Sequence, residues 1–154
     1  MAPEWVLETV GKAKISYNSN TSRKRAYVEM PMVTDVPGRG IDMTTGFAYE
    51  RRSVKPLWFN VEFTADTESF GNVPGHEVVV ECDGQKFDLG KAWAPEPLAK
   101  DASRLVLKKA ILYDTFVRAF GGQTVKIRLG SYSFHLGEAE RAAVRDLIKL
   151  TETR

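Results

Sequence analysis

Few residues in this chain have the types and spacing that nucleophilic catalysis requires. The two histidines are His76 and His135, and the single cysteine is Cys82. His76 precedes Cys82 by six positions, and six residues of extended strand span about 20 Å, far beyond hydrogen-bond distance. His135 falls opposite Lys126 on the polar face of a predicted hairpin, which favours a solvated position. The spacing predicts no catalytic residue, and it leaves open whether the fold brings His135 to Cys82.

No group of residues has the spacing of a metal or phosphate site. One cysteine and two distant histidines form no zinc motif, and the loop carboxylates Asp66 and Glu68 are too few for a calcium loop. Gly38 and Gly40 lack the third glycine of a dinucleotide-binding turn. We therefore expect no metal and no cofactor. A carboxylate pair stays open as an enzyme hypothesis, because 20 Asp and Glu residues offer many combinations.

Basic residues beside aromatic residues are the feature most typical of a binding surface. The candidate binding residues are Arg23, Lys24, Arg25, Tyr49, Arg51 and Arg52. A sheet that displays arginines and aromatic rings can bind single-stranded nucleic acid through phosphate contacts and base stacking. Basic runs also protect exposed sheet edges from aggregation. The net charge of only +2 favours edge protection and keeps nucleic-acid binding as the alternative.

The elements that must position these residues show mainly the alternation of strands. The clearest hairpin spans residues 125–136 around Gly130 and Ser131, where the leading glycine predicts a type II′ turn. Its register places six apolar side chains on one face: Val125 opposite Leu136, Ile127 opposite Phe134 and Leu129 opposite Tyr132.

A second hairpin joins residues 78–82 to residues 85–89. The turn is Asp83-Gly84, one of the strongest two-residue hairpin signals. The register pairs Val78 with Leu89, Val80 with Phe87 and Glu81 with Lys86. The last pair joins opposite charges on the outer face.

Further strands are expected upstream. Residues 5–17 form one long strand or two strands interrupted at Gly11, and residues 26–33 form a strand that Pro31 places at a sheet edge. The remaining expectations are strands at 46–52 and 57–64, and connections at 36–45, 66–75 and 92–102.

Two helices complete the predicted fold. The first spans residues 113–120 and ends at Gly121, and the second spans residues 138–150 with Glu138 in its first turn. With 43% hydrophobic and 27% charged residues, the composition is that of a globular protein. We predict a mainly β fold, α+β at its most helical: an antiparallel β-sandwich or curved sheet in a single domain at 1–154.

Location and assembly are only weakly indicated. No apolar run approaches the roughly 20 residues of a membrane-spanning helix, and the first residues show no leader pattern. The expected location is periplasmic or secreted if a leader peptide preceded Met1, and cytoplasmic otherwise. Residues 57–59 and Trp93 are expected in the core rather than at an oligomer interface, because large aromatic side chains are usually buried.

The C-terminal half combines the Asp83-Gly84 hairpin, the strand pair around Gly130 and the closing helix. In this pattern residues 78–150 resemble small β-rich domains of uncharacterised, often exported bacterial proteins. The resemblance implies a compact β domain that works outside the cytoplasm, and it carries over no functional residue.

The leading functional hypothesis is a non-enzymatic binding or accessory module for a protein or small-molecule partner. It depends on the lack of a recognisable nucleophile, base or metal constellation in the sequence. The first alternative is a nucleic-acid-binding β domain that uses the basic and aromatic residues. The second is an enzyme whose carboxylates converge in a pocket.

Overall fold

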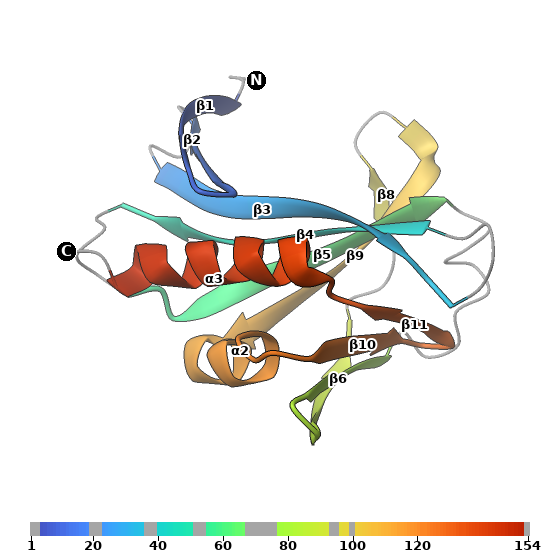
Figure 1. The fold of residues 1–154 in the computed structure, drawn as a ribbon. Coiled ribbons are helices and arrows are strands. Elements are labelled where there is room, and N and C mark those ends of the chain that lie inside the picture. Colours follow the sequence, from blue (N-terminus) through green and yellow to red (C-terminus); the bar gives the residue numbers. More distant parts are fainter. Residues whose placement is uncertain are drawn as a thin grey trace.

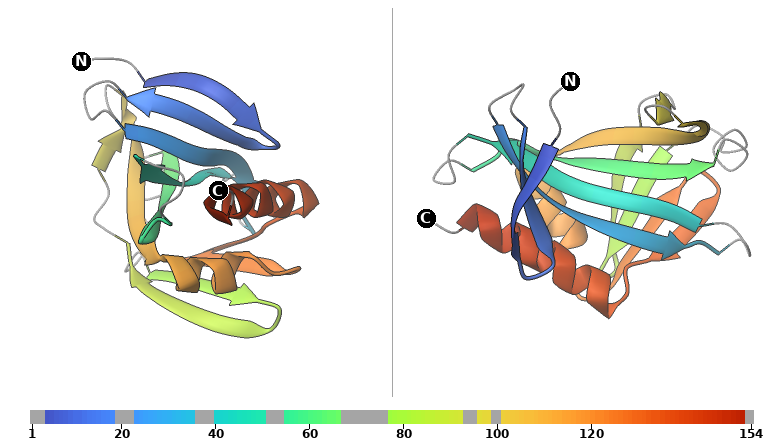
Figure 2. Two further views of the ribbon diagram at one scale, coloured as in Figure 1. Left: turned by 90° about the vertical axis from the view of Figure 1, so that its left-hand side faces the viewer. Right: turned by 90° about the horizontal axis from the view of Figure 1, so that it is seen from above.

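The computed structural model describes residues 4–18, 23–35, 40–50, 55–66, 77–92, 96–98 and 101–152. Within these residues the chain forms two antiparallel sheets and two helices (Figure 1). The helices lie on the side of the large sheet that faces the small sheet (Figure 2). The prediction of a mainly β, antiparallel fold with a short helix and a C-terminal helix is confirmed.

The large sheet has seven strands in the order β1-β2-β3-β4-β5-β9-β8. Their bounds are β1 Glu4–Val10, β2 Ala13–Asn18, β3 Arg23–Val33, β4 Gly40–Tyr49, β5 Trp58–Asp66, β8 Glu96–Leu98 and β9 Asp101–Leu112. Gly11, at φ 60°, turns the chain between β1 and β2, so residues 5–17 form two strands. The pairing of β2 with β3 ends at Tyr27. Pro31 therefore lies on a stretch of β3 beyond that pairing, which suits a residue without an N–H donor.

The small sheet has the order β11-β10-β6-β7. Its strands are β6 Glu77–Cys82, β7 Gln85–Lys91, β10 Val125–Leu129 and β11 Tyr132–His135. Both predicted turns are confirmed: Gly130 has φ 58°, as a type II′ turn requires, whereas Asp83 and Gly84 have φ 51° and 85°, as a type I′ turn requires. The predicted pairs Leu129–Tyr132, Ile127–Phe134, Val80–Phe87 and Glu81–Lys86 are present.

One predicted pair of the second hairpin is replaced by an irregularity. The register of β6 and β7 shifts near Val78, so that Leu89 and Gly90 together lie opposite this residue. Gly90 has φ 80°, a conformation that glycine adopts without steric penalty and that is typical of a β-bulge.

Two segments that we expected to be connections contain strands instead. β4 already begins at Gly40, within the expected loop at 36–45, and β8 and the first residues of β9 lie within the expected connection at 92–102. Glycine and proline signals locate a turn but do not say how far it extends. Pro97 is accommodated because β8 is a three-residue edge strand.

The two helices are where the sequence predicts them. They are α2 (Tyr113–Phe120) and α3 (Glu138–Glu152). The N–H of Gly121 donates to the carbonyl of Val117 at the end of α2. α3 packs against β2 and β3 through a buried stripe that includes Ala143, Val144 and Leu147.

Aromatic rings in the core connect the large sheet to α2. Phe59 of β5 stacks on Phe116 at a centroid distance of 4.0 Å, and Phe116 stacks on Phe120 at 4.7 Å. The expectation that residues 57–59 lie in the core is right for Phe59, which is fully buried, and wrong for its neighbours. Trp58 is 47% exposed because alternate strand residues point to opposite faces, and Leu57, which precedes the first residue of β5, is 73% exposed. Trp93 lies outside the described residues.

The side chain of Asp83 ties the turn of the β6–β7 hairpin to the segment that precedes β10. It accepts hydrogen bonds from the backbone N–H groups of Thr124, at 2.8 Å, and Gln123, at 3.0 Å, and one from the hydroxyl of Thr124. The backbone N–H of Thr124 is the main reason that the pKa of the Asp83 carboxyl lies below its ordinary value.

Replacing Phe59 by alanine should destabilise the fold strongly, because it empties a fully buried site between β5 and α2. We expect a loss of about 3–5 kcal/mol in the free energy of unfolding, measured by urea titration. Trp58→Ala, next in the chain but half exposed, should change it by less than about 1 kcal/mol. Equal losses in the two variants would contradict the described faces of β5.

Asp83→Asn should reduce the acid sensitivity of the protein. A carboxyl whose folded pKa is lowered stabilises the fold above its unfolded pKa, and this stabilisation is lost as the pH falls below about 4. Asn-Gly also forms type I′ turns, so the hairpin should persist. The free energy of unfolding, measured by urea titration, should fall less between pH 6 and pH 3 for the variant than for the parent chain. An equal fall in both proteins would refute the role given to Asp83.

Candidate functional site

The outer face of the large sheet, away from the core, has a shallow trough along β4. The outward-facing residues of β4 here are Gly46 and Ala48, which have little or no side chain. Gly46 pairs with Tyr27 of β3 on one side and with Asn60 of β5 on the other. Because neighbouring strands lie about 4.8 Å apart, the side chains of β3 and β5 stand roughly 10 Å apart across this floor.

The first hollow of the trough surrounds Trp58 and has a volume of about 550 Å³. Pro56, Leu57 and Trp58 form its apolar side. Polar groups surround this platform: Arg23, Glu50, Lys55 and Asn60. Leu112, the cross-strand partner of Trp58, is also exposed, so the apolar surface continues onto β9.

The second hollow surrounds Arg25 and has a volume of about 270 Å³. The Arg25 guanidinium lies 4.1 Å from the centroid of the Tyr27 ring, which stacks the two side chains. The close approach of β3 to β4 at this point requires Gly46, because a Cβ there would overlap the carbonyl oxygen of Ala26 and lie 2.7 Å from the Cβ of Tyr27. The opposite side of the hollow is polar and is formed by Asn60, Glu62 and Lys108.

Asn60 lines both hollows, so they are adjacent parts of one surface. We call the two together the outer groove. Its residues come from β3, β4, β5 and β9 and from the segment before β5, so pairing across the large sheet is what assembles it.

The predicted binding residues are only partly brought together. Arg23 and Arg25 line the outer groove, whereas the alternation of β3 directs Lys24, which is exposed, to the opposite face. Arg51 and Arg52 lie outside the described residues. The edge-protection interpretation of residues 23–25 is wrong, because β3 is paired on both sides there, with β2 and with β4.

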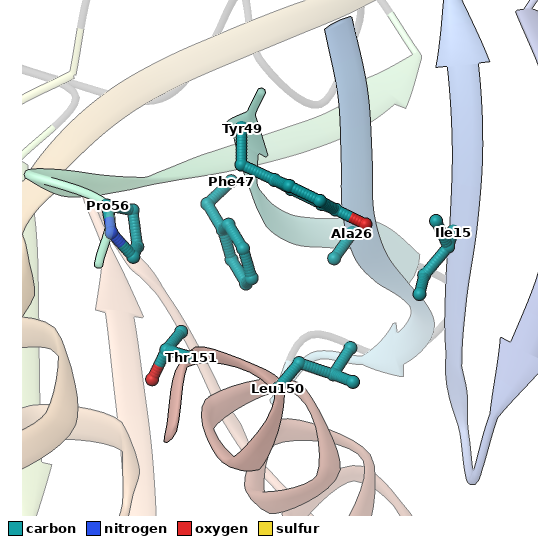
Figure 3. Close-up of a pocket in the computed structure, with 7 residues that line it drawn as sticks. All are labelled: Ile15, Ala26, Phe47, Tyr49, Pro56, Leu150 and Thr151. Atoms are coloured by element: carbon teal, nitrogen blue, oxygen red, sulfur yellow. The ribbon is translucent and has the colours of Figure 1, made fainter. Parts of the chain in front are cut away.

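The ring of Tyr49 points inward. Tyr49 is 6% exposed and lies beside Phe47, with a centroid distance of 5.7 Å. Figure 3 shows the Phe47 ring directed toward α3 and the Tyr49 ring extending toward Ala26. Both residues line a cavity of about 10 Å³. Such a volume holds about one water molecule and no larger ligand.

The fold does not bring His135 to Cys82. His135 is exposed and pairs with Lys126, as the sequence predicts, whereas Cys82 is 5% exposed within the core. Burial raises the pKa of the Cys82 thiol above its ordinary value, which disfavours the reactive thiolate. His76 lies outside the described residues. In the part of the chain that is described, no three His, Cys, Asp or Glu residues are placed to hold a metal ion.

Sequence reasoning did not include Trp58 among the candidate binding residues, because residues 57–59 were expected in the core. The signal was present in the alternation of Phe59, Val61 and Phe63, which places Trp58 on the same face as Asn60. Lys108 was missed because β9 was not recognised as a strand.

Among curated proteins, the chain is similar to Lectin 6 of Medicago truncatula, with 36% identity over 81 residues. The similar region is 49% of this chain and 26% of that lectin, so the chain spans about a quarter of the length of the relative it matches. No protein-family model matches the chain, and no solved structure matches it. Within the described residues, none of the helices combines the length and the apolar character needed to cross a bilayer.

Proposed function

We propose that this protein is a non-enzymatic carbohydrate-binding module that holds a saccharide in the outer groove. The observation that carries the proposal is Trp58, which is 47% exposed and lines a hollow instead of being buried like the neighbouring Phe59. An exposed aromatic residue in a concave site is a typical binding platform. The similarity to Lectin 6 supports the same conclusion, because a lectin is a carbohydrate-binding protein.

The chemistry of the groove suits a sugar ring. One face of a pyranose presents C–H groups, which pack on an aromatic ring, and the rim presents hydroxyl groups. The Asn60 amide can donate and accept hydrogen bonds, the Glu50 carboxylate accepts them and the Arg23 guanidinium donates them. These polar groups border the platform of Trp58 and Leu57. The C–H face and the hydroxyl rim of such a ligand would therefore each have a partner.

The distribution of carboxylates favours binding over hydrolysis. Glycoside hydrolysis uses two carboxylates that flank one bond. In the outer groove, Glu50 lines the first hollow and Glu62 the second. Each hollow therefore has a single described carboxylate.

Binding of single-stranded nucleic acid is the second candidate. Arg23 and Arg25 line the same groove as Trp58, and cations beside an aromatic platform also hold phosphates and stacked bases. Glu50 and Glu62 stand on the same surface and would repel a phosphate backbone, which makes this candidate weaker than a saccharide.

Two variants test the proposed site. Trp58→Ala removes the platform, and Ala48→Tyr fills the trough without removing a polar group. A glycan array should identify a saccharide ligand for the parent chain, and isothermal titration with that ligand should show at least about tenfold weaker binding for both variants.

The control for added bulk is Gln85→Tyr, at an exposed position of the small sheet, and it should bind as the parent chain does. The proposal fails if the parent chain binds no glycan, or if Trp58→Ala and Ala48→Tyr bind as tightly as the parent chain. Binding of an oligodeoxythymidylate that weakens steeply with salt, without glycan binding, would instead establish the nucleic-acid candidate.

A further inference from the structure

We propose that the saccharide is acidic, and that Arg25 and Lys108 hold its carboxylate or sulfate in the second hollow while an adjacent ring lies on Trp58. The proposal rests on the carbohydrate-binding function proposed above. It adds the charge class of the ligand and assigns different tasks to the two hollows.

The guanidinium of Arg25 is held in place by stacking. It stacks on Tyr27 at 4.1 Å, and the Tyr27 ring is itself 8% exposed above the floor at Gly46. A stacked guanidinium keeps its N–H groups at the edge of the plane, where they can donate two parallel hydrogen bonds to a carboxylate or sulfate. The rigid packing beneath Arg25 reduces the entropy that binding must overcome.

Lys108 supplies the facing cation. It lies on β9 as the register partner of Glu62 and lines the second hollow with it. The next residue, Lys109, has its ammonium on the other side of the sheet, where it donates a hydrogen bond of 3.2 Å to the carbonyl of Lys91 in β7. Lys109 also borders the second hollow, but its ammonium is engaged with Lys91, so Lys109 is a control for a neighbouring lysine whose charge is directed away from the ligand.

The groove as a whole favours a negative ligand. Apart from Lys109 and Lys55, whose ammonium groups lie against the Lys91 carbonyl and the Tyr113 ring, three cationic residues and two carboxylates line the two hollows: Arg23, Arg25, Lys108, Glu50 and Glu62. A concave surface with an excess of cations concentrates anions. β3 is paired with β2 and with β4 near these arginines, so edge protection does not explain why they lie in the groove.

The arrangement of the hollows also limits the ligand. The first hollow and the second hollow meet at Asn60. A step of two residues along β5, as from Trp58 to Asn60, covers about 7 Å. A ligand that uses both hollows must therefore have at least two sugar rings. The mixed charges make a moderately acidic saccharide a better fit than a polymer with a charge on every phosphate.

The test compares acidic tetrasaccharides with their neutral methyl esters. Isothermal titration of the full chain would use tetragalacturonate, tetraglucuronate and tetramannuronate, each beside its methyl ester, and a sulfated heparin tetrasaccharide. We expect at least one acidic tetrasaccharide to bind about tenfold more tightly than its neutral form. Whether a carboxylated or the sulfated tetrasaccharide binds more tightly identifies the anion that the second hollow binds.

The variants Arg25→Gln and Lys108→Gln should each remove most of this preference for the acid over its ester, whereas Lys109→Gln should keep the preference. Thermal unfolding of each variant verifies the fold. Equal binding of acids and esters that still depends on Trp58 would overturn this inference and leave the proposed function standing. If no saccharide binds, both fail, and binding of oligodeoxythymidylate alone would replace them with nucleic-acid recognition.

Discussion

The burial of one face of the large sheet is the constraint on which the rest of the structure depends. Phe59 and Phe63 of β5 and Met43 of β4 are fully buried on that face, and they pack against the helices and the small sheet. Because side chains alternate along a strand, a shift of one residue in the strand register would move these side chains into solvent. The same constraint directs Trp58, Asn60 and Glu62 outward, so the outer groove takes its geometry from the packing of the core.

The groove also depends on the small residues of β4. A central strand normally carries β-branched or aromatic side chains on both faces, since these pack well against their neighbours. Here the outward positions are Gly46 and Ala48, and the Tyr27 ring lies beside the glycine, an arrangement that compensates for the missing side chain. The sheet thus keeps a low floor between two strands with large side chains, and Arg25 gains a flat surface on which to stack.

Local chemistry made much of the fold predictable. The turns at Asp83-Gly84 and Gly130-Ser131 fix their hairpins through glycine conformations, and α3 is marked by its apolar stripe. β9 escaped prediction because Lys108 and Lys109 interrupt its apolar residues, and its pairing with β5 joins positions far apart in the sequence. The groove was missed for the same reason: strand order decides which strands lie side by side, and local sequence patterns do not show it.

The arginines of β3 show how strand order changes the meaning of a motif. In the sequence, residues 23–25 are a basic run, and such runs commonly guard a free edge. In the sheet, this stretch pairs with β2 on one side and β4 on the other, so no edge is present to guard. Alternation then separates Lys24 from Arg23 and Arg25 and leaves two guanidinium groups on the groove face, next to Trp58 and Asn60. Through this separation, a basic run that protects no edge places two spaced cations beside an aromatic platform, and this is the arrangement that the proposed acidic saccharide requires.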